Sequence, residues 1–79
     1  MSRKPKTELA TVNNRVEAFR LRAGLNRQDL ADAVGVHYQT IGYIERGEYS
    51  PSLVLALKIA SAVNAMVEDL FWLEGSLDE

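Results

Sequence analysis

The sequence contains no cysteine, so disulfides, thiolate metal ligands and cysteine nucleophiles are all excluded. His37 is the only histidine, and one imidazole cannot by itself form a histidine metal site or a His-paired catalytic triad. The longest uninterrupted apolar run, Leu53–Leu57, is far shorter than the roughly 20 residues that a membrane-spanning helix needs. No apolar stretch follows the basic residues near the N-terminus, so we do not expect a secretory signal. We therefore expect a small cytoplasmic domain with no cofactor, no metal and no membrane contact.

The chain also lacks the basic surplus that a DNA-binding domain usually shows. Its 79 residues carry nine Lys and Arg against eleven Asp and Glu, a formal net charge of −2. The charge is unevenly distributed, because residues 1–50 carry eight of the nine basic groups and only six of the acidic ones. The front half can therefore face phosphate groups while the acidic rear half faces away from them.

Hydrophobic spacing predicts five helices and no strand, an all-α fold in one compact domain over residues 11–74. The first helix is expected over residues 12–23, with Val12, Val16 and Phe19 on its inward side. The others are expected over residues 27–34, over residues 38–46, from Leu53 onward and over residues 67–73. Residues 1–10 are expected to form a flexible basic arm, which either reaches DNA or only keeps the protein soluble, and residues 75–79 an acidic tail.

The helix that begins near Leu53 is apolar around most of its circumference. Pro51 suits a first helical turn, and either Ser50 or Ser52 is the expected cap. One apolar stripe contains Leu53, Ala56, Leu57, Ala60 and Val63, and a second contains Leu55, Ile59, Ala62 and Met66. A helix of this kind lies at the centre of a core or in an interface.

The most informative unit is the pair of short helices over residues 27–46, joined by a tight turn at Gly35. Asn26 is the expected N-cap of the first helix, and Ala31 falls where the two helices cross and only a small side chain fits. In the second helix Ile41 and Ile44 point inward, and the opposite side carries Tyr38, Gln39, Gly42, Tyr43 and Arg46. This pattern is typical of a helix-turn-helix, whose second helix enters the DNA major groove.

Residues 14–71 resemble the lambda-repressor/Cro (xenobiotic-response-element) type of helix-turn-helix DNA-binding protein. The matching strings are Gly24-Leu25-Asn26-Arg27-Gln28-Asp29-Leu30-Ala31, Val34-Gly35-Val36, Gln39-Thr40-Ile41, Ile44-Glu45-Arg46-Gly47, Pro51-Ser52-Leu53, Ala56-Leu57-Lys58-Ile59-Ala60 and Val67-Glu68-Asp69-Leu70-Phe71. They occur in the family's order and at its spacing, and they cover about three quarters of the chain. The resemblance implies a compact five-helix, lambda-repressor-like domain.

The resemblance also implies roles for individual residues. Bases would be contacted by Tyr38, Gln39 and Tyr43, and the DNA backbone by Arg27, His37, Thr40 and Arg46. Arg20 and Glu45 match a pair that forms a buried ion pair between the first and third helices. Three residues depart from the family pattern: Glu48 stands where Lys or Arg is frequent, Gly42 replaces a polar residue, and Met66 stands where a capping Ser or Thr is common.

The sequence favours a homodimeric, sequence-specific transcriptional regulator, expected to repress from a palindromic operator in double-stranded DNA. Its dimer interface would contain Leu55, Ile59, Trp72 and Leu73, although the same side chains can instead close the monomer's own core. The alternative is a protein-interaction adaptor or antitoxin that uses the helical scaffold mainly to bind a partner protein. No residues indicate catalysis, and no small-molecule ligand is implied.

Overall fold

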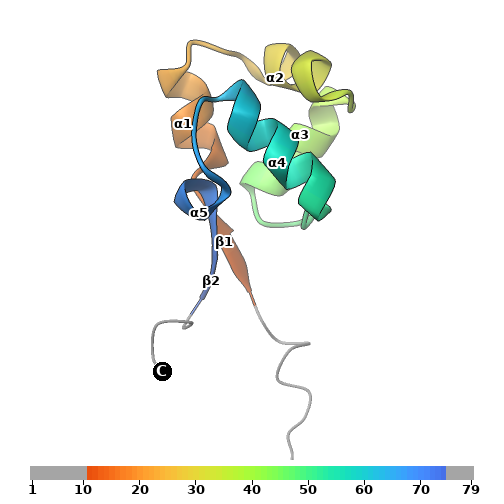
Figure 1. Cartoon of the computed structure of the whole chain (residues 1–79). Coiled ribbons are helices and arrows are strands. Elements are labelled where there is room, and N and C mark those ends of the chain that lie inside the picture. The colour runs from red at the N-terminus through yellow and green to blue at the C-terminus, as the bar shows by residue number, and fades with distance from the viewer. Residues whose placement is uncertain (1–10, 75–79) are drawn as a thin grey trace, which may run out of the picture.

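The computed structural model describes residues 11–74, which form five helices and one pair of short strands (Figure 1). In chain order the elements are β1 (Val12–Asn14), α1 (Val16–Arg22), α2 (Arg27–Val34), α3 (Tyr38–Glu45), α4 (Leu53–Ala62), α5 (Val67–Leu70) and β2 (Phe71–Leu73). The expected basic arm, residues 1–10, and the expected acidic tail, residues 75–79, lie outside the described residues. Among residues 11–74, no helix has the length and apolar character needed to cross a membrane.

The fold is mostly helical, but the expectation of an all-α domain is wrong at both ends of the described chain. β1 and β2 pair antiparallel, with Asn13 opposite Trp72. The predicted first helix therefore begins only at Val16, and the predicted last helix already ends at Leu70. Figure 1 shows the two strands side by side below the helices.

Hydrogen bonds at Asn14 and Arg15 explain the late start of α1. The Asn14 side-chain oxygen accepts a hydrogen bond from the Val16 amide at 3.0 Å, a local bond of the kind that competes with helix formation. The Arg15 amide donates to the Leu70 carbonyl at 2.9 Å, which draws the start of α1 to the end of α5. Val12 consequently lies on a half-buried strand rather than on an inward helix stripe.

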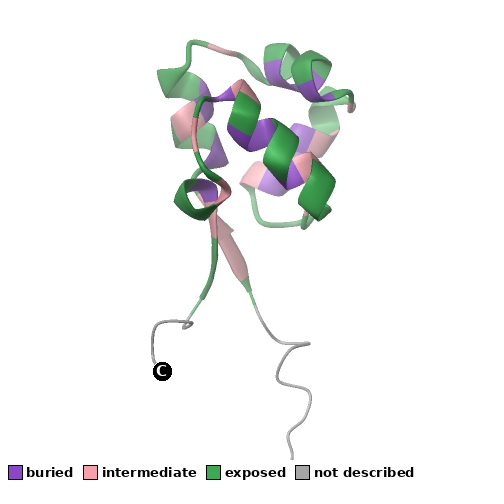
Figure 2. Ribbon diagram, in the orientation of Figure 1, coloured by how far each residue is buried: buried purple, intermediate pink, exposed green. Residues whose placement is uncertain are grey.

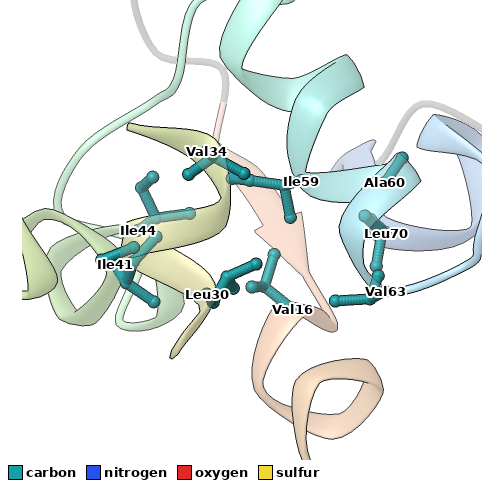
Figure 3. Close-up of a cluster of buried hydrophobic side chains, with 10 residues drawn as sticks. Val16, Leu30, Val34, Ile41, Ile44, Ile59, Ala60, Val63 and Leu70 are labelled. Carbon is teal, nitrogen blue, oxygen red and sulfur yellow. The ribbon is translucent and has the colours of Figure 1, made fainter. Parts of the chain in front are cut away.

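The core is one cluster of side chains contributed by all five helices (Figure 3). Ala31 is fully buried, as expected for a small side chain at a helix crossing, and so are Ile41 on α3 and Val16 on α1. The whole cluster comprises Val16, Leu30, Ala31, Val34, Ile41, Ile44, Ile59, Ala60, Val63 and Leu70. Because α3 is anchored in this cluster by two isoleucines, its opposite side is held in a fixed direction.

The buried side of α4 takes residues from both expected stripes, Ala56 and Ala60 from the first and Ile59 from the second. Leu53 and Leu57 are 70% and 52% exposed, although the sequence placed them on a common stripe with core residues. Ile59 is 0% exposed, so its assignment to a dimer interface is wrong, and Leu55 is half-buried against the core. The side chain of Ser52 caps the start of α4. Leu53 is exposed because the first turn of the helix lies outside the core (Figure 2).

Candidate nucleic-acid interface

The turn between α2 and α3 sets the direction in which α3 leaves the body. Gly35 adopts a left-handed conformation with φ of 81°, which ends α2, and its amide donates to the Ala31 carbonyl at 2.8 Å. His37 caps α3, because its Nδ1 accepts a hydrogen bond from the Gln39 amide at 3.1 Å. The α2 start is fixed equally well, since Asn26 and Asp29 exchange side-chain to backbone hydrogen bonds.

The side of α3 that faces away from the core is exposed. Ile41 and Ile44 are 0% and 1% exposed, whereas Tyr38 and Tyr43 are 46% and 45% exposed. Gln39 is also exposed, and the structure thus brings the three expected base-contacting residues onto one open side of the helix. The His37 ring is exposed and stacks on Tyr38 with 4.8 Å between centroids, whereas Thr40 is half-buried.

The Glu45 carboxylate lies between two arginines. Arg20 Nε lies 2.7 Å from Glu45 Oε2, and the side chains of this expected pair are 6% and 2% exposed. Arg20 also donates to the Leu25 carbonyl at 3.0 Å, so the guanidinium joins α1 both to α3 and to the loop before α2. Buried charges need close partners, and here the Arg20 guanidinium and the Glu45 carboxylate are partners of each other.

A second arginine at this carboxylate was missed by the sequence reasoning. Arg27 Nε lies 2.9 Å from Glu45 Oε1, and the Arg27 side chain remains 43% exposed. Two guanidinium groups therefore share the Glu45 carboxylate, and Arg20 also lies 3.9 Å from the exposed carboxylate of Glu17. Nothing in helical periodicity could indicate the contact, because Arg27 and Glu45 lie on different helices and 18 residues apart.

Asn14 was also missed, although it fixes the end of α3. Its side-chain nitrogen donates to the Ile44 carbonyl at 2.9 Å, and this bond ties β1 to the last turn of the helix. A helix C-terminus leaves carbonyls without helical partners, and an amide side chain from a neighbouring strand satisfies one of them. The strand pair therefore helps to position α3 and also joins the two ends of the described chain.

The outward side of α3 contains a hollow of about 190 Å³. It is lined by Arg27, Tyr38, Gln39, Gly42, Tyr43 and Arg46. Gly42 was expected to be open to the outside, but it is buried, because the Arg46 and Arg27 side chains cover it. A Cβ at Gly42 would stand 3.2 Å from Arg46 Nη1, so any other residue there would require the arginine side chain to shift by a few tenths of an ångström.

The Arg46 side chain lies back along α3 and does not extend away from the end of the helix. Its Nε lies 3.3 Å from Glu48 Oε2, and its guanidinium carbon lies 5.3 Å from the centre of the Tyr43 ring. Glu48, which departs from the family pattern, thus has an acidic side chain paired with a neighbouring arginine. Both side chains are about half exposed, 51% for Arg46 and 56% for Glu48.

Comparisons with known proteins agree with this geometry. A family model described as Helix-turn-helix (HTH_3) matches residues 16–65. A Bacillus subtilis protein named as the uncharacterized HTH-type transcriptional regulator YgzD is 48% identical over 63 residues, which cover 80% of this chain and 96% of that protein. Among solved structures, the Aeromonas hydrophila restriction-modification controller protein C.AhdI matches with a TM-score of 0.64 at 31% identity, over 68% of this chain and 82% of that chain. An HTH_3 family transcriptional regulator from Vibrio cholerae matches with a TM-score of 0.60 at 35% identity, over 68% of this chain but only 30% of that one.

Proposed function

Because the chain belongs to the HTH_3 helix-turn-helix family, we propose that it is a sequence-specific regulator of transcription that binds double-stranded DNA. The observation that carries the proposal is the outward side of α3, where Tyr38, Gln39 and Tyr43 are exposed beside the anchored charge of Arg27. An α-helix fits the major groove, and polar side chains on such a helix can read the edges of base pairs. Although the chain as a whole carries a net charge of −2, the two charged side chains that line the hollow on α3, Arg27 and Arg46, are both basic.

Individual contacts follow from the chemistry of the side chains. Gln39 is suited to a two-bond contact with an adenine, through N6 and N7. Tyr38 and Tyr43 can pack against thymine methyl groups or donate their hydroxyls to phosphate oxygens. We propose that Arg27, His37 and Thr40 contact the DNA backbone. Such backbone contacts fix the register in which the bases are read.

The substitution Gln39→Ala is expected to weaken binding to the preferred sequence by about 1–3 kcal/mol, because it removes one direct base contact. The preferred sequence would be found by selection from random duplexes, and affinity would be measured by electrophoretic shift at several salt concentrations.

Wild-type affinity is expected to fall steeply with salt, since bound arginines displace counterions from the DNA. Gln28→Ala is the matched control, because Gln28 bonds to Asp32 on the outside of α2. Binding that is absent or insensitive to salt would contradict the proposal.

A second candidate function is favoured by the exposed apolar start of α4. Leu53, Val54 and Leu57 are all more than half exposed, a surface suited to a partner protein. An adaptor or antitoxin that uses this surface would keep its partner after the double substitution Gln39→Ala and Tyr43→Ala. A DNA-binding regulator would lose its operator after the same change, so the double variant separates the two functions.

We further propose that the protein represses transcription as a homodimer on a palindromic operator. One domain of this size offers few base contacts, and two copies related by a two-fold axis would read half-sites about 34 Å apart. The proposed interface contains half-buried Leu55 together with Trp72 and Leu73 of β2, which are 36% and 48% exposed. Covering the exposed apolar area of these side chains with a second apolar surface would favour association in proportion to the area removed from water.

Leu73→Glu is therefore expected to shift the protein from dimer to monomer, because it places a charge in the proposed apolar interface. Sedimentation velocity over a range of protein concentrations would measure the change. Leu21→Glu is the control, since Leu21 is 61% exposed on α1 and lies outside the proposed interface. A monomeric wild type together with a selected sequence that lacks symmetry would contradict the dimer.

A further inference from the structure

Arg46 follows the last residue of α3, yet its guanidinium lies back over the middle of the helix. Its Nη1 occupies space that a side chain at position 42 would otherwise fill, 3.2 Å from the missing Cβ of Gly42. The same guanidinium lies 5.3 Å from the Tyr43 ring centre, at a distance typical of cation–π contact. The charged group of Arg46 is therefore level with Tyr43, a proposed base-contacting residue, and lines the same hollow as Gln39.

Glu48 determines which donors of Arg46 remain available. The carboxylate pairs with Nε at 3.3 Å, so the terminal nitrogens, Nη1 and Nη2, are the Arg46 donors that Glu48 does not take up. It also places a negative charge next to the arginine, which opposes a phosphate at the same position. A neutral ligand with two acceptors does not meet this repulsion.

Gly42 leaves room for two guanidinium groups beside α3. Without a Cβ at this position, both Arg46 Nη1 and Arg27 Nε lie within 4 Å of the same point on the helix. Arg27 is held there by Glu45, and Arg46 is held by Glu48 and Tyr43. Each guanidinium therefore already has partners on this side of α3 before any ligand binds.

From this arrangement we propose that Arg46 reads a guanine base in the major groove, that Gly42 makes room for it, and that Glu48 positions it. Guanine presents two acceptors, O6 and N7, on its major-groove edge, and arginine is the side chain that most often pairs with both. The assignment replaces the sequence-based expectation that Arg46 contacts the DNA backbone. It rests on the proposed DNA-binding function and specifies one base that the protein recognises.

The test compares wild type with Arg46→Ala on the selected operator and on duplexes changed at one base pair at a time. The wild type is expected to prefer guanine at one position of each half-site. Arg46→Ala is expected to lose about 5- to 100-fold in affinity for the guanine-containing duplex and to bind the substituted duplex nearly as the wild type does. Its salt dependence should remain that of the wild type, because no phosphate contact is removed.

Two further variants test the roles of the neighbouring residues. Gly42→Ala is expected to reduce the preference for guanine at the same position while leaving the helix folded, because alanine favours helices more than glycine does. Glu48→Gln is expected to raise affinity for unrelated duplexes and to lower the guanine preference, since it removes the charge that opposes phosphate. Arg22→Ala is the matched control, because Arg22 is an arginine over an aromatic ring, Phe19, at the end of α1.

One result would overturn the inference while leaving the proposed function in place. If Arg46→Ala weakens binding to all duplexes equally and lowers the salt slope by about one, Arg46 contacts a phosphate and not a base. If the wild type prefers no sequence at all, the proposed function itself fails, and this inference fails with it. Thermal unfolding of each variant, followed by circular dichroism, would show that the comparison is made between folded proteins.

Discussion

Glu45→Ala is expected to lower the free energy of unfolding by about 3–5 kcal/mol, because it leaves the buried guanidinium of Arg20 with only the distant, exposed carboxylate of Glu17, 3.9 Å away. Arg20 is 5% exposed, and its Nε lies 2.7 Å from the carboxylate that this change removes. Arg27 would lose the same partner, but its exposed side chain can turn into water at little cost. Chemical denaturation followed by circular dichroism would measure the loss.

Glu48→Ala is the matched control for this substitution. It also removes a carboxylate from an arginine pair, but both partners are about half exposed, so we expect a loss of no more than about 1 kcal/mol. Replacing Arg20 and Glu45 together with apolar residues of similar volume is expected to be less damaging than replacing either one alone, since no charge is left buried. If Glu45→Ala were no worse than Glu48→Ala, the buried pair would not be holding α1 against α3.

Ile59→Ala is expected to destabilise the domain by about 2–5 kcal/mol, because the shortened side chain leaves a cavity in the core. Ile59 is 0% exposed and lies within the single hydrophobic cluster of the domain. The effect would be seen as a lower denaturation midpoint at every protein concentration, since Ile59 packs against residues of its own chain.

Leu57→Ala, two residues earlier on the same helix, is the control for Ile59→Ala. Leu57 is 52% exposed, so its truncation is expected to change stability by no more than about 0.5 kcal/mol. A variant Ile59→Ala that kept the wild-type stability but lost self-association would return this residue to a subunit interface and contradict the structure.

Much of the helix-turn-helix was predictable from the sequence because its signals are local. Asn26 and Asp29 are three residues apart and cap one another, and Gly35 ends α2 with the backbone conformation that glycine adopts most easily. Ile41 and Ile44 share one side of a single helix, which leaves Tyr38 and Tyr43 outside. Each of these features depends on a few residues that are close in the sequence, so the sequence pattern alone is enough to predict it.

The features that were not predicted depend on residues far apart in the chain. Val12 has the spacing of a helix stripe with Val16 and Phe19, but its segment becomes a strand by pairing with β2, about 60 residues further along the chain. Arg27 bonds to a carboxylate on another helix, and Arg46 lies over Gly42 because of where Glu48 and Tyr43 stand in space. On α4 the buried side crosses both apolar stripes, because contacts with the neighbouring helices decide which of its apolar side chains are covered.

The strand pair has a consequence for how the domain can be joined to other sequences. The Thr11 carbonyl accepts a hydrogen bond from the Glu74 amide at 2.8 Å, so the chain enters and leaves the domain at adjacent points (Figure 1). A polypeptide whose ends meet can be inserted into a host protein through one site or circularly permuted without pulling its helices apart. Both connections of this domain to other sequences can therefore be made at the same place on its surface.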